Sequence, residues 1–393
     1  MTIRVSVRKS DFVAVVGRVI QFSGTGKGAN SGYQLVSIVS IKDRLRVAAN
    51  SGSGSARELL PVVELKGDVA WAISCAHVMR LLPIISGLKD KMTLTQIENA
   101  VCLESGATRL TLPLQSPDSL YPLASPPRNW LEADVGGLMG LINQMSWAVA
   151  REQIRPILSG VYVGRDYCQA TNAEVLAHRH QSIVTGHDGF VVPGSAFRNI
   201  ASFVDGGENV RVGVESNRVW FRGRRWIVHT QLIGGSYPDL LPMILDADGG
   251  EVQFVRDEKR RVYSVKFDRH HLMDVVDRIS RITVTAEETR AGANVLFVVR
   301  DNKLHLISHC ADVSSPTIAI DEEVEWHDGP NVTHLDMSPF ASFEGYGFKA
   351  QYVFQALKSM SHKRVVFMWT DGCDLPLQLH EPGYTALVMP RRI

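Results

Sequence analysis

Apolar residues recur at spacings of three and four in three long segments, the spacing typical of one face of an amphipathic helix. In the first segment, Phe12, Val15 and Val19 fall on one stripe. An Asp or Ser near the start of each segment suits an N-cap or the positive end of the helix dipole. The pattern therefore predicts helices within residues 6–23, 131–148 and 265–283.

A second, shorter apolar stripe follows each of these segments, and a block of alternating apolar and polar residues follows each stripe. Strict alternation with Gly or Asn turns is typical of antiparallel hairpins. The second helices are expected within residues 73–86, 192–205 and 348–361. Strands are expected within 91–114, 209–233 and 364–390, and between the paired helices, for example within 160–172 and 294–308.

The order helix, strands, helix, strands thus occurs three times, at intervals of about 125–135 residues. The turn-rich stretches near Ser125 and Asp246 separate the copies. We expect an α+β protein of three tandem copies of one unit, with two helices packed on antiparallel sheets, and domains at residues 1–127, 128–250 and 251–393. Three unrelated α+β domains with the same element order are the alternative.

Such copies can hide their strand edges by joining sheets edge to edge. A chain with two unlike ends can then close into a ring as a head-to-tail dimer, with helices lining the hole.

Charge limits how nucleic acid could be held. The 393 residues include 42 Lys and Arg against 41 Asp and Glu, a net charge of +1, so bulk charge alone would not bind a polyanion. The predicted helices are nevertheless biased toward basic residues, which could hold a polyanion inside a ring without sequence readout. The alternative is that these are ordinary solvated helix faces. The basic residues are Arg8, Lys9, Arg18, Arg80, Arg151, Arg155, Arg198, Arg269, Arg278, Arg281, Lys349, Lys358, Lys363 and Arg364.

The five cysteines lie far apart and form no C-x-x-C pair, which argues against a disulfide framework and a zinc ribbon. The first residues lack the apolar core of a secretory signal, and no stretch approaches the length of a membrane helix. We expect a cytoplasmic protein.

Four short segments, in order along the repeat, resemble those of the bacterial DNA polymerase III beta subunit, the DNA sliding clamp. They are residues 155–160, 169–177, 236–244 and 386–393. The resemblance covers the whole chain and implies half of a six-domain ring, a homodimer that encircles duplex DNA and tethers polymerases and clamp-loader subunits. These partners would bind through short linear peptides, and the family implies no cofactor, metal or catalytic residue.

Carried over residue by residue, the resemblance implies three sites. Leu and Met side chains suit an adaptable apolar cleft for peptide anchors, and core packing is the alternative for Leu158 and Leu176. The peptide pocket would comprise Arg155, Leu158, Thr171, Leu176, Pro238, Met243, Tyr352, Leu387, Met389, Pro390 and Arg391. The DNA contacts would be Lys27, Arg80, Arg151, Arg155 and Arg198, and the dimer contacts Leu110, Leu112, Arg281 and Ile282.

The chain departs from the family pattern at the pocket rim. The family's Asp-Gly-His-Arg is replaced by residues 172–175, Asn-Ala-Glu-Val, and its Arg pair by Leu241 and Pro242. The rim is then less basic, so we expect a peptide with acidic flanks to bind less well here. This indicates a divergent clamp or a paralogue with altered partners.

The sequence contains little that supports a catalytic function. Residues 24–28 read Gly-Thr-Gly-Lys-Gly but lack the first Gly and the final Ser or Thr of a phosphate loop. His178 and His180 could share a strand face, yet no Cys or carboxylate completes a metal set. We expect no enzyme. Two alternatives stay open: an interaction module that does not encircle DNA and keeps only the peptide pocket, and an unrecognised hydrolase.

Overall fold

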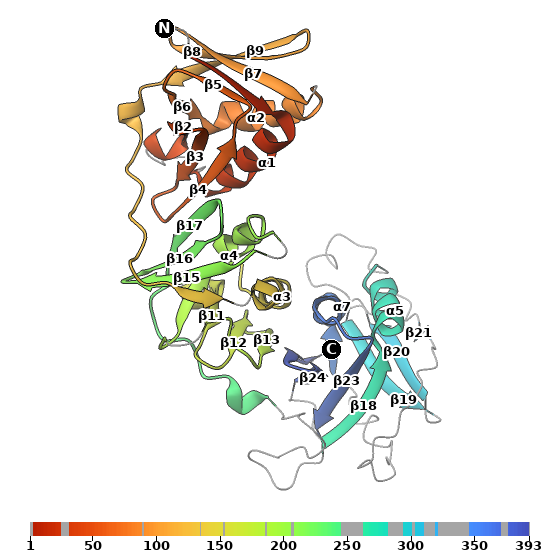
Figure 1. Cartoon of the computed structure of the whole chain (residues 1–393). Coiled ribbons are helices and arrows are strands. Elements are labelled where there is room, and N and C mark those ends of the chain that lie inside the picture. The colour runs from red at the N-terminus through yellow and green to blue at the C-terminus, as the bar shows by residue number, and fades with distance from the viewer. Residues whose placement is uncertain are drawn as a thin grey trace. The chain divides into compact units, whose positions relative to one another are not determined.

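The computed structural model describes residues 3–24, 31–88, 90–133, 135–151, 154–184, 187–205, 208–244, 262–281, 294–300, 303–309, 319–320, 346–370 and 376–392. The chain divides into two compact units, and Figure 1 labels their helices and strands. Unit 1 comprises Met1–Met139, Ile183–Gly186 and Phe190–Gly234; unit 2 comprises Gly140–Ser182, His187–Gly189 and Gly235–Ile393. The domain boundaries expected from the sequence remain a prediction.

Each of the six segments predicted to be helical contains a helix. Antiparallel strands occupy the alternating segments between them, so the α+β fold class is confirmed. The helices are α1 (Lys9–Val19), α2 (Cys75–Ser86), α3 (Val135–Met145), α4 (Gly194–Ala201), α5 (Arg269–Arg281) and α7 (Ala350–Ser359). Short 3-10 turns are Ile20–Phe22, Ser31–Gln34, Pro117–Ser119, Pro156–Ser159 and Leu241–Met243.

Unit 1 is built on one 13-stranded sheet in the order β10-β15-β16-β17-β4-β3-β2-β6-β9-β8-β7-β1-β5. Its first nine strands are β1 (Arg4–Arg8), β2 (Leu35–Ile41), β3 (Arg44–Asn50), β4 (Gly54–Pro61), β5 (Glu64–Lys66), β6 (Ala70–Ser74), β7 (Lys91–Ile97), β8 (Ala100–Ser105) and β9 (Thr108–Gln115). The others are β10 (Leu131–Ala133), β15 (Val210–Glu215), β16 (Arg218–Arg222) and β17 (Trp226–Gln231), and β14 (Phe190–Pro193) precedes α4.

Helix α1 shows why the apolar stripe predicts an element correctly. Phe12, Val15, Val16 and Val19 are at most 3% exposed and face β3, β4 and α2. Burying a large apolar side chain stabilises a fold by about 1.5–3 kcal/mol. The stripe therefore fixes which face of α1 turns toward the sheet.

The first and second repeats join edge to edge within unit 1. Strand β17 pairs with β4 over five residues, from Trp226 opposite Glu58 to Thr230 opposite Gly54. At this joint the Ser55 hydroxyl lies 2.7 Å from His229 Nδ1, and the His229 ring stacks on Trp220. Each edge is thereby paired, as expected from the repeat.

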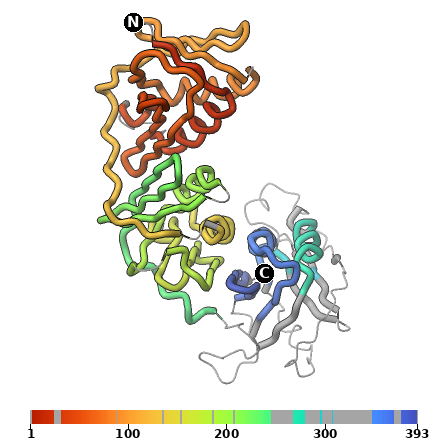
Figure 2. The backbone as a smooth tube through the Cα atoms, in the orientation of Figure 1, coloured from red at the N-terminus to blue at the C-terminus, as the bar shows by residue number. Residues whose placement is uncertain are grey.

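Between β9 and β10 the chain runs as an extended segment (Figure 2). The Ala124 carbonyl accepts a hydrogen bond from Arg57 Nη2 at 3.2 Å, and the Pro122 carbonyl accepts one from Asn50 Nδ2 at 3.3 Å. The segment therefore crosses the sheet face that carries Arg57.

In unit 2 a continuous antiparallel sheet runs β11-β12-β13-β25-β24-β23-β18, and a second sheet runs β21-β20-β19-β22-β26. The first sheet contains β11 (Gly160–Val163), β12 (Cys168–Thr171), β13 (Val175–Arg179), β18 (Val262–Asp268), β23 (Arg364–Thr370), β24 (Leu377–Glu381) and β25 (Tyr384–Val388). The second contains β19 (Asn294–Arg300), β20 (Lys303–His309), β21 (Ala319–Ile320), β22 (Tyr346–Lys349) and β26 (Arg391–Arg392).

The second and third repeats join in the same way. Strand β13 pairs with β25 from Val175 opposite Val388 to Arg179 opposite Tyr384. This joint brings the C-terminal strand beside residues 168–179. Among the described residues, no helix is long and apolar enough to cross a membrane.

Candidate functional site

A row of four side chains crosses the joint between β13 and β25. Directly opposed residues share a sheet face, and here Thr171 opposes Leu176, Leu176 opposes Leu387, and Leu387 opposes Gln378. All four are at most 5% exposed. Three of the predicted pocket residues, Thr171, Leu176 and Leu387, are therefore brought together as a buried floor, and an incoming peptide would not meet them directly.

Thr171 contributes little polar character to this floor. Its hydroxyl donates to the Val175 carbonyl at 2.6 Å and accepts from the Ala173 amide at 3.1 Å. Ala173 has a φ of +74°, a left-handed conformation that favours Gly or Asn. The Thr171 hydroxyl thus holds a strained turn between β12 and β13.

The accessible pocket residues come from a second segment. The Gln378 amide donates to the Met243 carbonyl at 2.9 Å, which places residues 241–243 beside the floor. Met243 is 38% exposed, and Pro238 is exposed as well. This segment supplies the adaptable, solvent-facing apolar surface.

The chain end supplies the other accessible residues. The Met389 amide donates to the Glu174 carbonyl at 2.9 Å, so the tail stays against the β12–β13 turn. Beyond it, β26 pairs with β22, with Arg391 opposite Gly347. Met389 and Pro390 are half-buried.

Glu174 is the most highly connected polar group of this site. Its carboxylate accepts a hydrogen bond from the Tyr352 hydroxyl at 2.5 Å and forms a hydrogen-bonded ion pair with Arg391. Lys349 Nζ lies 4.6 Å from the centre of the Tyr352 ring. Partial burial works to raise the pKa of Glu174, but the hydrogen bonds from Tyr352 and Arg391 and the nearby positive charges outweigh it and lower that pKa.

The remaining pocket candidates lie at the start of the second repeat's strands. Leu158 is 6% exposed, and its carbonyl accepts from the Ala150 amide at 2.9 Å. Arg155 is exposed just before the turn that contains Leu158.

The expected DNA contacts are divided between the units. Arg80 on α2 and Arg198 on α4 are exposed in unit 1, and Arg151 and Arg155 are exposed in unit 2. Lys27 lies outside the described residues. Whether these side chains face one surface remains a prediction.

The expected dimer contacts differ in exposure. Leu110 and Leu112 both lie on β9, where Leu112 is 3% exposed and Leu110 is half-buried. Arg281 is the last residue of α5, and Ile282 lies outside the described residues. Within the described chain, β6 pairs with β9 only at Leu114 and Gln115. The stretch of β9 before Leu114 therefore has β8 on one side and no recorded strand on the other.

Histidines on β13 and β24 have structural roles. The rings of His178 and His180 lie 4.6 Å apart, and Gln169 Nε2 lies 3.0 Å from His178 Nδ1. Burial, with the charges of His180 and His380, lowers the pKa of His178 to about 3. Among the described residues no group of three His, Cys, Asp or Glu side chains could hold a metal ion.

Sequence reasoning noted Glu174 as an added acid but missed its partners. Arg391 follows Glu174 by 217 residues, and nothing in the local pattern pairs them. The sequence offered one signal for this pair. Glu174 replaces a basic residue of the family pattern beside a turn, and Arg391 lies in the segment at the chain end that resembles the family.

Comparisons with known proteins agree with this arrangement. Residues 134–239 match the family model described as DNA polymerase III beta subunit, central domain. The beta sliding clamp of Streptococcus pneumoniae is 23% identical over 297 residues, which are 72% of this chain and 69% of that relative.

Two solved structures are similar over the whole chain. The DNA polymerase sliding clamp of Bacillus subtilis has a TM-score of 0.77 at 17% identity, covering 100% of both chains. The beta sliding clamp of C. crescentus, with polyethylene glycol bound at the region assigned to beta-motif tethering, has a TM-score of 0.78 at 17% identity, covering 100% of this chain and 99% of that one. Likenesses at these identities establish the fold.

Proposed function

We propose that this chain, a divergent relative of the bacterial DNA polymerase III beta subunit with the sliding-clamp fold, acts in DNA replication as a homodimeric ring. The ring would encircle duplex DNA and tether polymerases and clamp-loader subunits through short peptides. The protein would work in the cytoplasm and without catalysis, because enclosure alone holds the DNA.

One observation carries this proposal. Adjacent repeats share continuous sheets, at β4–β17 and at β13–β25, while among the described residues the stretch of β9 before Leu114 pairs with a strand on one side only. An array that pairs its inner edges and leaves an outer edge open is suited to head-to-tail closure with a second copy.

The peptide pocket is proposed over the floor formed by Thr171, Leu176 and Leu387. Met243, Pro238, Met389 and Pro390 are its accessible apolar residues, and Leu158, Arg155, Tyr352 and Arg391 would form its margins. Polyethylene glycol at the tethering region of the C. crescentus clamp supports a binding cleft of this kind in a protein of the same fold.

The proposed DNA contacts are Arg80, Arg151, Arg155 and Arg198, with Lys27. They would meet phosphates, so affinity for DNA should fall steeply with salt and show no base preference.

The solution mass tests ring formation. We expect the wild-type protein to have twice the mass of one chain, and Leu110→Asp to shift it to the monomer because a carboxylate would enter an apolar strand contact. Val63→Asp is the matched control, because Val63 is 58% exposed in unit 1 outside β9. A wild-type monomer at micromolar concentration would favour the alternative, an interaction module that keeps only the pocket.

A further inference from the structure

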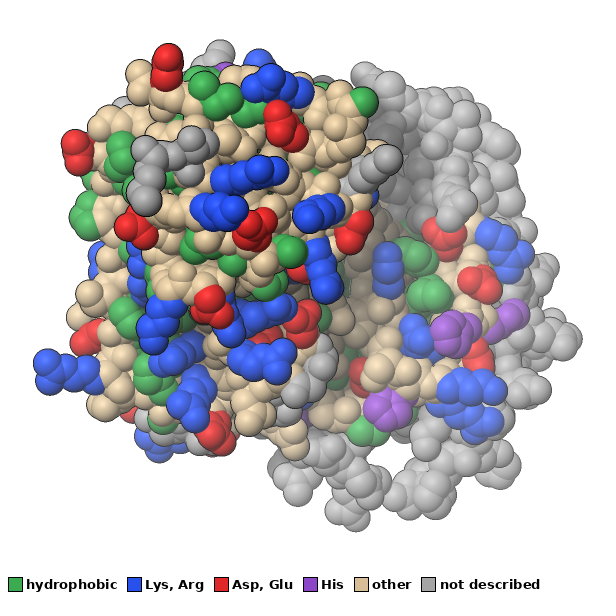
Figure 3. All heavy atoms as spheres, turned by 45° about the horizontal axis from the view of Figure 1, so that its top comes forward, with side chains coloured by type: hydrophobic (Ala, Val, Ile, Leu, Met, Phe, Trp, Pro, Cys, Tyr) green, Lys and Arg blue, Asp and Glu red, His purple; other side chains and the backbone are tan. Residues whose placement is uncertain are grey.

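Arginine side chains form a row across the sheet of unit 1, on the face opposite α1. Arg57, Ile227, Arg222 and Arg211 are successive opposed residues on β4, β17, β16 and β15, so they share one face. Glu58, the neighbour of Arg57, binds Arg18 of α1 and therefore lies on the other face. Figure 3 shows many Lys and Arg side chains, with Asp and Glu side chains among them, on the face in view.

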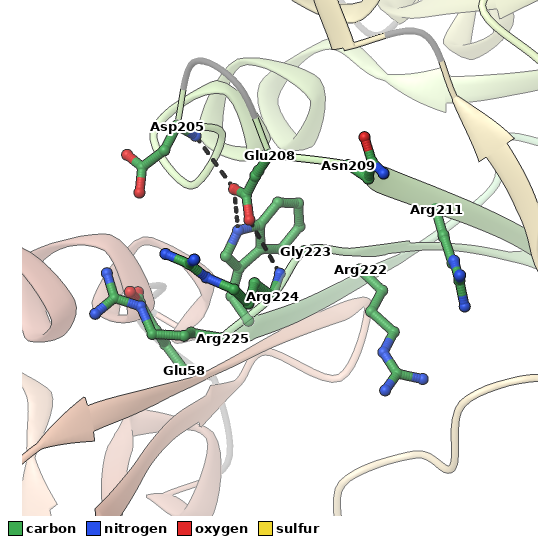
Figure 4. Close-up of a pocket in the computed structure, with 10 residues that line it drawn as sticks. Glu58, Asp205, Glu208, Asn209, Arg211, Arg222, Gly223, Arg224 and Arg225 are labelled. Carbon is green, nitrogen blue, oxygen red and sulfur yellow. Dashed lines mark hydrogen bonds between the residues drawn. The ribbon is translucent and has the colours of Figure 1, made fainter.

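Two cavities lie beside this row. The larger, of about 660 Å³, is lined by Arg211, Arg222, Arg224 and Arg225 together with acidic residues (Figure 4). The smaller, of about 250 Å³, is lined by Arg44, Leu59, Pro61 and Arg225, among others. Arg225 lines both cavities, and Asp43 is the acidic residue of the smaller one; the two cavities together are called the basic depression below.

Two of the three acidic residues that line the larger cavity, Glu58 and Glu208, are engaged within the protein, and Asp205 is the third. Glu58 is held by two hydrogen bonds from Arg18, at 2.6 and 3.0 Å. Glu208 accepts hydrogen bonds from the amides of Asp205 and Arg224, at 3.2 and 3.0 Å, and from Trp226 Nε1 at 2.8 Å (Figure 4). The ion pair with Arg18 therefore neutralises Glu58, whereas Glu208, held by uncharged donors, keeps its negative charge beside the arginines.

The guanidinium groups are far less engaged. Arg222 lies over the Trp130 ring at 5.7 Å, and Arg211 forms an exposed pair with Glu132 at 3.9 Å. Within the described part of the chain, neither Arg224 nor Arg225 has a side-chain partner. Arg57 is engaged differently, because its Nη2 donates to the Ala124 carbonyl and its guanidinium lies over the Trp220 ring. With four arginines against the carboxylates of Asp205 and Glu208, the lining of the larger cavity keeps an excess of positive charge.

We propose that this depression, centred on Arg222, Arg224 and Arg225 at the turn between β16 and β17, binds the phosphate backbone of a nucleic-acid strand. The planar guanidinium fork matches phosphate oxygens with two parallel hydrogen bonds. Neighbouring strands are about 4.8 Å apart, so the row offers positive groups at intervals of roughly 5–10 Å along a line. The site differs from the DNA contacts proposed above, which include α2 and α4, and it does not depend on them.

An acidic protein segment is the competing ligand, and the lining disfavours it. Protein interfaces depend on apolar or aromatic anchors at their centre. The lining of the larger cavity is charged or polar apart from Gly223 and Trp226, and Trp226 is 4% exposed. Binding of a phosphate backbone requires only positively charged groups and no apolar anchor.

The test uses a fluorescein-labelled single-stranded oligodeoxynucleotide and the full-length protein, with anisotropy measured over a range of salt concentrations. The triple variant Arg222→Gln/Arg224→Gln/Arg225→Gln should bind at least about tenfold more weakly at low salt. Because each lost phosphate contact lowers the slope of log K against log salt by about 0.7 for a single strand, the slope should fall by about 2. The variant Arg222→Lys/Arg224→Lys/Arg225→Lys keeps the charge and should keep most of the slope.

The matched control removes three exposed positive charges elsewhere: Lys66→Gln/Lys91→Gln/Arg165→Gln. It should bind like the wild type. An unchanged slope in the Gln triple variant, a wild type that binds no oligonucleotide, or displacement by polyglutamate but not by unlabelled oligonucleotide would each overturn the proposal. Retention of the same variants on circular duplex is scored separately, so failure here is distinguishable from failure of the clamp function.

Discussion

Glu174 and Arg391 form a hydrogen-bonded ion pair between the β12–β13 turn and the last strand of the chain. The same carboxylate accepts a hydrogen bond from the hydroxyl of Tyr352 on α7. The Glu174 carboxylate therefore already pairs with Arg391, the cation expected at the rim of the proposed peptide pocket. A partner peptide with acidic flanks must displace that carboxylate before it can use Arg391.

Replacing Glu174 should therefore change partner preference. We expect Glu174→Ala to strengthen binding of a clamp-motif peptide with acidic flanks by up to about fivefold, because partly exposed ion pairs are worth up to about 1 kcal/mol. The same peptide with neutral flanks should bind unchanged, as measured by titration calorimetry. Asp166→Ala removes an exposed acid of unit 2 as a control. Equal gains for both peptides would contradict the assignment.

The chain end is expected to carry most of the pocket's affinity. Met389→Ala, or deletion of the last five residues, should abolish measurable binding of clamp-motif peptides, a loss of at least about 30-fold, as for a central apolar anchor. The dimer should remain intact by mass, because none of the expected dimer contacts lies in the last five residues. Met79→Ala is the control, since Met79 is 44% exposed on α2. Unchanged peptide affinity in both tail variants would show that the pocket lies elsewhere.

The Arg18–Glu58 pair should be a strong stabilising contact of unit 1. The Glu58 side chain is 3% exposed, and Arg18 binds it with two hydrogen bonds. Arg18→Ala leaves that carboxylate buried and unpaired, at a cost of about 3–5 kcal/mol, visible as a lower Tm of the first unfolding transition.

Two further variants distinguish a buried pair from a surface one. The double variant Arg18→Met/Glu58→Met should recover most of the lost stability, because it removes the unpaired charge. Lys66→Ala, which breaks an exposed pair with Glu64, should cost far less stability than Arg18→Ala, because solvent screens that pair. If Arg18→Ala lowered the stability no more than Lys66→Ala does, the proposed role of the Arg18–Glu58 pair would be wrong.

Acid should destabilise the β4–β17 joint through His229. Burial and the positive charges of Arg218 and Arg57 lower the pKa of His229 to about 4 in the native state, against an ordinary value of about 6.5. The unfolded chain therefore takes up the proton first, so stability is fully present above about pH 6.5 and falls by about 3 kcal/mol as the pH drops to about 4.

His229→Gln can still bond to Ser55 and should remove this part of the pH dependence in chemical denaturation. His77→Gln, at an exposed position of α2, should leave the pH dependence as in the wild type. A His229→Gln profile that parallels the wild type between pH 6.5 and 4 would contradict the assignment.

Local periodicity was enough to predict the helices. In α1 and α4 the residues that must be buried recur at helical spacing, so they are visible in the sequence as an apolar stripe. The edge strands made it possible to predict that the repeats join. The register could not be predicted, because Val175 and Val388 are 213 residues apart in the sequence and only the folded packing places them opposite each other. The resemblance supplied Leu176 and Leu387 for the predicted pocket, and only the coordinates show that the two residues are buried and opposed across the β13–β25 joint.

The basic depression was not anticipated, for a related reason. Arg222, Arg224 and Arg225 surround one Gly in the sequence, which reads as an ordinary hairpin turn. Their juxtaposition with Arg44 and Arg57 requires the β4–β17 joint. Charge clusters built by strand pairing are invisible to a scan along the chain.

The central claim is that the protein holds DNA by enclosing it, and retention on circular DNA tests this most directly. The protein is loaded by its clamp loader onto a nicked circular plasmid, isolated by gel filtration, and then treated with an enzyme that cuts the plasmid once. We expect it to stay on the circle in salt that abolishes phosphate contacts, and to leave as soon as the DNA is linear. Equal retention on circular and linear DNA, or loss from both, would contradict the claim.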